Sequence, residues 1–279
     1  MALTVNTNLS SLIVQQNLND ATTSLNKAIE RMTTGYKINH AKDNAAGYSI
    51  ATNWTTQLGS IDVALENASM GMDMLTTMEG NLELITGHLQ RIRDLTEQAA
   101  NGTFGTTSLA AIKEEMTART SEITRIASNA EYNGIKLFNG GSAVNLQVGI
   151  KQGSTNTITL AATLFAKADA TALLSNTATF LTNATTTSTA AAQLATLDTK
   201  INSISERATK IGALQNSLES AISALNVQSQ NVTSSLSTIR DSDVAAESSA
   251  YIKSQILQQA SATLLSTANQ APSIALNLI

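Results

Sequence analysis

Cysteine is absent from this 279-residue chain, and Pro272 is its one proline. Without cysteine, the chain can form neither a disulfide framework nor a zinc site built on thiolates. Because proline interrupts helices, its scarcity leaves room for very long ones. Charged residues make up 14% of the chain, well below the usual level of about 25%. A surface with so few charges carries little like-charge repulsion, which suits close packing of many identical copies.

Long apolar runs and basic clusters are missing as well. No run of about 18 apolar residues occurs, so we expect no membrane-spanning helix. The first basic residue is Lys27, and polar residues interrupt the apolar ones before it, so the N-terminus does not fit a cleavable signal peptide. The net charge of -4 argues against a nucleic-acid partner, which would favour a basic surface. A chain of this kind that leaves the cell would need a route that does not read such a signal.

The residue types that perform chemistry are sparse. The two histidines, His40 and His88, form no metal-ligating motif with nearby residues. No nucleophile with a base, no phosphate-binding loop and no ligand cluster stands out. We therefore expect no metal, no cofactor and no enzymatic activity.

The two ends of the chain carry matching hydrophobic patterns. Apolar residues recur every three to four positions in both, which is typical of amphipathic helices that need a partner surface. The positions on which we base an assembly role are Leu9, Leu12, Leu18, Leu25, Ile256, Leu257, Leu264 and Leu265. The simplest interpretation is that the two ends pair with each other and with neighbouring copies. The pattern favours assembly over catalysis.

Between the ends, the periodicity predicts a rod. From Ala51 to Ala99, apolar residues follow one another at spacings of three and four, and a seam of about seven heptads is typical of a coiled coil. The helix would be roughly 75 Å long at its ordinary rise. Asn101-Gly102 is a strong turn signal, and further helices are expected from Thr107 to about Ala130 and over 197–239.

A short region in the middle has a different pattern. Residues 133–160 alternate or are β-branched between glycine-rich turns, which predicts antiparallel strands. The Ala- and Thr-rich residues 161–195 allow no assignment. The expected fold is mainly α: a long antiparallel coiled-coil rod with paired terminal helices and a small β-hairpin region at the tip. The expected divisions are 1–34 with 245–279 as terminal helices, 35–50 as a spoke, 51–140 with 195–244 as the rod, and 141–194 as a short variable region.

Several sequence blocks resemble bacterial flagellin. They include VNTNLSSLIVQQNL and ERMTTGYKINHAKDNAAGYSIA near the start, RIRDLTEQAANGTFG in the first half, and IGALQNSLESAISALNVQSQNV and IRDSDVAAESSAYIKSQILQQA toward the end. The likeness covers about 1–140 and 195–279, in the family's order. Thr33-Thr34 stands where the family often has two serines, and Tyr48 where an aliphatic residue is usual. The short central region implies that the outer domains of larger flagellins are absent.

The resemblance implies a structural subunit that polymerises into the extracellular flagellar filament for motility. It implies secretion in an unfolded state through the flagellar type III apparatus, with a cap, junction proteins and an export chaperone as partners. The terminal helices would line the filament core, and the rods would surround them. One alternative is a hook–filament junction protein, which shares the terminal helices. Another is a secreted enzyme that uses the helices as a scaffold, for which no catalytic residues are found.

A second implication concerns one side of the rod. By resemblance, Arg91, Leu95 and Glu115 match residues that flagellins present to Toll-like receptor 5. The alternative interpretation is a charged helix flank that packs against a neighbouring protofilament. Receptor recognition would then apply to the monomer, because the filament would bury the same face.

Overall fold

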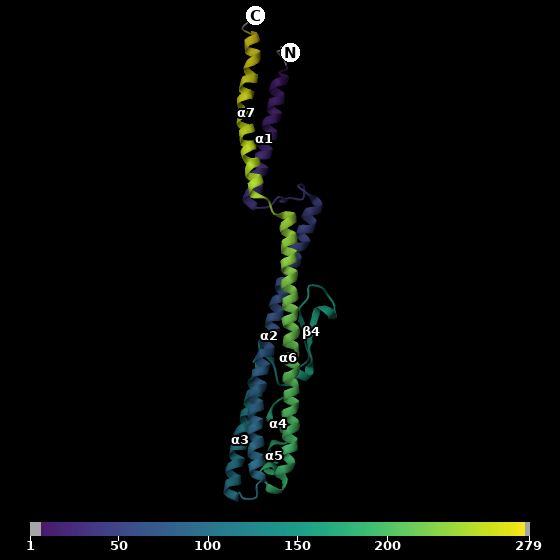
Figure 1. Ribbon diagram of the computed structural model, residues 1–279, viewed down its shortest axis with the longest axis vertical. Helices are drawn as coiled ribbons and strands as arrows, with labels where there is room; N and C mark the ends of the chain where they lie inside the picture. The colour runs from purple at the N-terminus through teal and green to yellow at the C-terminus, as the bar shows by residue number, and fades with distance from the viewer. Residues whose placement is uncertain (1–6, 277–279) are drawn as a thin grey trace. The chain divides into compact units, whose positions relative to one another are not determined.

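The computed structural model describes residues 7–276 of the chain. Two compact units divide it: residues Met1–Leu58 with Gln230–Ile279, here the terminal unit, and residues Gly59–Ser229, here the rod unit. Figure 1 shows the elements, which in chain order are α1 (Leu9–Thr34), α2 (Ala45–Ala100), α3 (Thr106–Asn129), β1 (Glu131–Tyr132), β2 (Ile135–Lys136), β3 (Val144–Gln147), η1 (Ser154–Asn156), β4 (Thr157–Leu160), η2 (Ala162–Phe165), α4 (Ala170–Leu174), α5 (Thr177–Ala184), α6 (Thr187–Arg240) and α7 (Val244–Leu276). Helices α2 and α6 contribute residues to both units.

Helices α2 and α6 run antiparallel within the rod unit. Arg93 Nε lies 2.6 Å from Asp198 Oδ1, and Gln215 Nε2 donates to Glu79 Oε2 at 2.9 Å. The α2 position therefore falls as the α6 position rises. The predicted mainly α fold with long antiparallel helices is confirmed. Helix α2 begins at Ala45, inside the segment that the sequence assigned to the spoke.

The heptad seam predicted for α2 is its buried face. Each seam residue from Ala51 to Ala99 is buried or half-buried. The most completely covered ones are Ile61, Leu75, Met78, Leu82, Ile85, Leu89 and Ile92. Helix α3 adds Met116 and Ile123 to the same core. Full burial of one such side chain stabilises the fold by about 1.5–3 kcal/mol, so the seam supplies much of the stability of the rod unit.

The β3–β4 hairpin is antiparallel and pairs Val144 with Leu160. It lies on the flank of α2, because Asn67 Nδ2 donates to the carbonyl oxygen of Gln147 at 3.1 Å. This contact is well short of the helix end at Ala100. The hairpin was expected at the tip of the rod, and that position is wrong. The apolar face of the hairpin needs an apolar partner, which the side of α2 provides and the polar turn after Ala100 does not.

Residues 161–195, which the sequence left unassigned, fold as short helices. Asp169 caps α4 by accepting from the backbone N–H of Ala172 at 2.7 Å, and Asn176 caps α5 by accepting from that of Thr179 at 3.2 Å. Both helices pack against α3. Helix α6 begins at Thr187, earlier than predicted. Alanine favours helix strongly, so the Ala-rich stretch continues α6 toward its N-terminus.

In the terminal unit, the segment that follows α1 is hydrogen-bonded to the segment between α6 and α7. Helix α1 ends at Gly35, whose φ of 73° is left-handed and suits glycine. The backbone N–H of Lys37 donates to Arg240 at 2.8 Å, and that of Ser242 donates to Gly35 at 2.8 Å. The Arg240 guanidinium lies 4.1 Å from the centre of the Tyr36 ring. The entry to α7 and the exit from α1 are therefore fixed together.

Candidate assembly surface

Helices α1 and α7 lie side by side and antiparallel (Figure 1). Four side-chain bonds set their register, and the partner on α7 changes from Ala268 and Asn269 at the start of α1 to Glu247 near its end. These bonds join Asn8 to the carbonyl of Ala268 (2.7 Å), Ser11 to Asn269 (2.7 Å), Thr22 to Gln258 (3.1 Å) and Arg31 to Glu247 (3.0 Å). Asn8 also caps α1 by accepting from the N–H of Ser11 at 3.1 Å. The predicted pairing of the two ends is confirmed within the described residues.

Small side chains form the most buried part of the α1–α7 seam. Ala21 and Ala28 on α1 are 6% and 3% exposed, and Ser254 and Ser261 on α7 are 7% and 8% exposed. Each pair is seven residues apart, which is the heptad repeat of a coiled coil. Small residues let two helices approach closely, but they bury little apolar area. The packing of α1 against α7 is therefore geometrically well defined, but it gains only a modest hydrophobic stabilisation.

Large apolar side chains of the same two helices face outward. We call this set the outer apolar surface: Leu9, Leu12, Ile13, Ile29, Met32, Val244, Ile252, Ile256, Leu257 and Leu264. Leu9 is 67% exposed, and Ile256 is 59% exposed. Soluble monomers rarely expose many large apolar residues on one element, and such surfaces mark interaction sites.

The eight residues predicted for assembly fall into two sets. Leu18, Leu25 and Leu265 are half-buried and lie toward the α1–α7 seam. The others belong to the outer apolar surface: Leu9, Leu12, Ile256, Leu257 and Leu264. The first set therefore holds the helix pair together, while the second remains free to meet another molecule. The sequence pattern did not distinguish these roles.

A second candidate site lies on the rod unit, where α2 meets α3. Arg91 donates two hydrogen bonds to Glu115, from Nε to Oε1 at 2.8 Å and from Nη2 to Oε2 at 3.2 Å. The pairing with Arg91 lowers the pKa of the Glu115 carboxyl below its usual range, and that with Glu115 raises the pKa of Arg91. Arg119 lies 3.5 Å from the same carboxylate. Both partners are half-buried, with side chains 42% and 35% exposed, so part of the pair can be reached by another molecule.

Leu95 is not available in the same way. It was expected to supply an apolar contact to a partner, but it is 1% exposed and belongs to the rod core. The same residue stands on the predicted seam of α2, and a seam residue cannot also face a partner. The expected contact by Leu95 is therefore withdrawn, and Arg91 with Glu115 remains.

Arg207 on α6 is a buried cation that the sequence analysis missed. It is 8% exposed, and its Nη2 donates to the carbonyls of Leu164 at 2.6 Å and Ala166 at 2.9 Å. Its guanidinium lies 5.3 Å from the centre of the Phe138 ring. Burial lowers the pKa of Arg207. The side chain ties the segment around η2 to α6.

Among residues 7–276, no three His, Cys, Asp or Glu side chains come together as a metal ion would require. Over the same residues, none of the helices combines the length and apolar character needed to cross a membrane. His40 Nε2 lies 2.8 Å from Glu30, on the surface of the terminal unit.

Comparison with known proteins agrees with this geometry. The N-terminal helical region of bacterial flagellin matches residues 5–143, and its C-terminal helical region matches 194–279. Polar flagellin F of Vibrio parahaemolyticus and Flagellin B of Vibrio cholerae are each 30% identical, over alignments that cover all of this chain and all of theirs. Phase 1 flagellin of Salmonella naestved is 41% identical over 57% of this chain and 32% of its own length.

A solved structure supports the fold alone. A protein described as flagellar hook-associated, from Vibrio parahaemolyticus, superposes with a TM-score of 0.62 at 15% identity, over 71% of this chain and all of its own. The sequence matches span both terminal helices and most of the rod, the elements that carry the candidate assembly surface. The chain belongs to the bacterial flagellin family.

Proposed function

We infer that this chain is a structural subunit of the extracellular bacterial flagellar filament and that it polymerises through the outer apolar surface. The observation that carries this function is the arrangement of α1 and α7, which bury small residues between them and expose large apolar ones. Water-exposed leucines such as Leu12 and Leu264 gain free energy when a neighbouring copy covers them. The family matches over both ends favour a filament subunit over the hook–filament junction protein.

The proposed division of the chain follows the sequence expectations. Residues 1–34 with 245–279 would line the filament core, residues 51–140 with 195–244 would surround it as the rod, and residues 35–50 would connect the two. Residues 141–194 form the short variable region of this division. We further propose unfolded export through the flagellar type III apparatus, with an export chaperone, and assembly under a cap protein beside junction proteins.

Truncation tests this function. Deleting the chain from Ser261 onward removes Leu264 and Leu265 but leaves the rod unit intact. The truncated chain should keep most of its helical circular dichroism and form no filaments in sedimentation or electron microscopy. Filaments of normal length from this variant would contradict the assignment of α7 to assembly.

A second proposed role concerns the half-buried Arg91–Glu115 pair. We propose that this pair meets Toll-like receptor 5 in the monomer and a neighbouring copy in the filament. The fork of an arginine forms two charge-assisted bonds that lysine reproduces poorly. Arg91→Ala should weaken monomer binding to the receptor by at least about tenfold, and Arg91→Lys should not restore it. Unchanged receptor signalling by both variants would rule out this role.

A further inference from the structure

The inference drawn here rests on the proposed function and gives it a specific contact on the rod unit. Identical copies that build an open filament must touch through two different patches, one complementary to the other, because a self-complementary patch closes a dimer. An exposed apolar side chain that fits a pocket elsewhere on the same molecule meets this requirement. The rod unit carries both parts.

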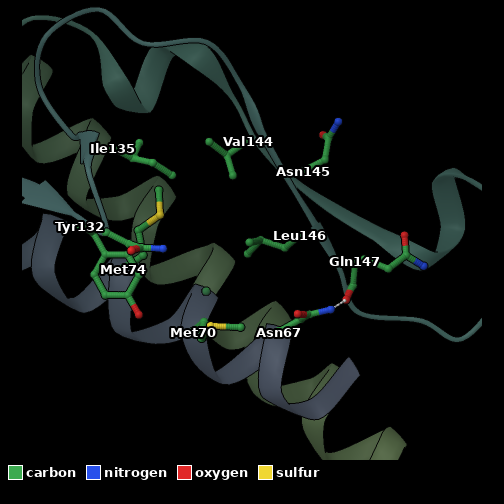
Figure 2. A pocket seen from close by; sticks show the side chains of 11 residues that line it. Asn67, Met70, Met74, Tyr132, Ile135, Val144, Asn145, Leu146 and Gln147 are labelled. Atoms are coloured by element: carbon green, nitrogen blue, oxygen red, sulfur yellow. Dashed lines mark hydrogen bonds between the residues drawn. The ribbon is translucent and has the colours of Figure 1, made fainter. Parts of the chain in front are cut away.

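The pocket, here the socket, lies between α2 and the β3–β4 hairpin. Its volume is about 350 Å³. Met70, Ile135 and Leu146 are among the residues that line it, and Figure 2 shows their side chains. Its apolar lining is open to solvent, since Met70 is 51% exposed and Ile135 is 40% exposed. Gly71 faces the hairpin directly, because a Cβ at this position would meet the end of the Leu146 side chain, which would have to shift. Methionine side chains adapt their shape, so the lining can close around an incoming group.

The complementary group is Phe104, in the turn between α2 and α3. It is an aromatic residue that is 38% exposed. The other large apolar residues exposed on the rod unit outside the socket lining are Val63, Leu84 and Val227, and all of them lie on helices. A residue on a turn at the end of a helix can enter a pocket that the side of a helix cannot.

The turn that carries Phe104 is already ordered. Asn101 Oδ1 accepts from the N–H of Thr103 at 3.2 Å and from its hydroxyl at 3.1 Å, and the N–H of Phe104 donates to the Asn101 carbonyl at 3.4 Å. A group fixed in its bound conformation loses less entropy on docking. Phe104 is therefore presented as a preorganised anchor.

Charge favours the same pairing. The turn residues 101–105 and all residues that line the socket are uncharged. Since each copy carries a net charge of -4, contact between uncharged patches avoids placing like charges together. Amide side chains at Asn67, Asn133 and Asn145 surround the apolar lining. A polar rim around an apolar centre is the usual anatomy of a protein interface.

We propose that Phe104 of one copy inserts into the socket of a second copy, so that a row of copies is joined head to tail. Met70 and Ala100 lie on the same helix, 30 positions apart by their numbers, which corresponds to about 45 Å at the helical rise. Successive copies in such a row are displaced along the rod by about this distance.

Cysteine pairing tests the contact in the full chain, because the protein has no cysteine of its own. The double variant Phe104→Cys/Val144→Cys places one thiol on the turn and one on the socket. Filaments of this variant, oxidised and run on a non-reducing gel, should give a ladder of covalent oligomers. The control Phe104→Cys/Leu84→Cys has its second thiol at an exposed position of α2, 14 positions along the helix from Met70 of the socket, and should give no ladder.

A second measurement does not depend on thiol geometry. Phe104→Ala should raise the critical concentration for polymerisation about tenfold, while Phe104→Leu, which keeps an apolar side chain, should raise it much less. Filaments without a ladder, an equal ladder in the control, or equal critical concentrations for Phe104→Ala and the unaltered chain would each overturn the contact. Loss of filaments in the unaltered chain would instead refute the proposed function, so the two failures are distinguishable.

Discussion

Leu264 offers the sharpest test of the outer apolar surface. Replacing it with alanine removes about three carbons, worth about 0.8 kcal/mol each on full burial, or about 2.4 kcal/mol. Because 57% of Leu264 is exposed in the single chain, assembly can newly bury about that share. The expected loss is about 1.4 kcal/mol per copy, equivalent to about a tenfold rise in critical concentration. Alanine is the best helix former, so α7 itself should not suffer.

The assay is sedimentation of filaments across a series of protein concentrations. The matched control is Gln259→Ala, which changes an exposed polar residue of the same helix and should leave the critical concentration near its original value. An unchanged critical concentration for Leu264→Ala would refute the reasoning. So would an equal rise for Gln259→Ala, because the effect would then not depend on apolar burial.

Three further outcomes are expected. Arg207→Met should lower the free energy of unfolding by about 1–3 kcal/mol in urea, because two buried carbonyls lose their donor; an unaltered midpoint would contradict this. The N–H of His40 first, and then Lys27, lower the pKa of Asp43, so its stabilisation is present at neutral pH and lost as pH falls through that depressed pKa; Asp43→Asn should remove this pH dependence from acid-unfolding curves. The amide of Leu12 should be more strongly protected from hydrogen exchange in filaments than in monomers, because the α1–α7 pair of one chain buries little apolar area until other copies cover it; equal protection in both would contradict it.

The rod could be predicted from sequence because its signal is local and long. In α2, every turn contributes an apolar residue to one face, from Ala51 to Ala99, and no proline interrupts it. The hairpin was predicted as strands but misplaced. It packs on α2 through residues that are far apart in the chain, such as Leu146 against Gly71 and Gln147 with Asn67, and no local pattern reports such contacts.

The assembly surface was predicted only in part, for a related reason. Hydrophobic patterns give weight to leucine and isoleucine, whereas the α1–α7 seam centres on Ala21, Ala28, Ser254 and Ser261. Alanine and serine contribute little to such a pattern. The seven-residue spacing of these small residues was therefore less apparent in the sequence than the spacing of the larger apolar ones. A search for small residues at seven-residue spacing would have found it.

Arg207 was missed although a signal was present. It stands three residues after Ile204 and four before Ile211, both of which are buried. That spacing places it on the core face of α6, where a cation needs acceptors. Its acceptors, the carbonyls of Leu164 and Ala166, could not be identified before the fold was known.

The arrangement of α1 and α7 links their order to polymerisation. If the large apolar residues packed between α1 and α7, each chain would bury them on its own and would gain little hydrophobic free energy from a neighbouring copy. With alanine and serine in the seam instead, the pair alone gains little hydrophobic free energy, and most of what α1 and α7 can gain comes when Leu12, Ile256 and Leu264 are covered by other copies. We therefore expect each added copy to order its own terminal helices as it buries those of its neighbours.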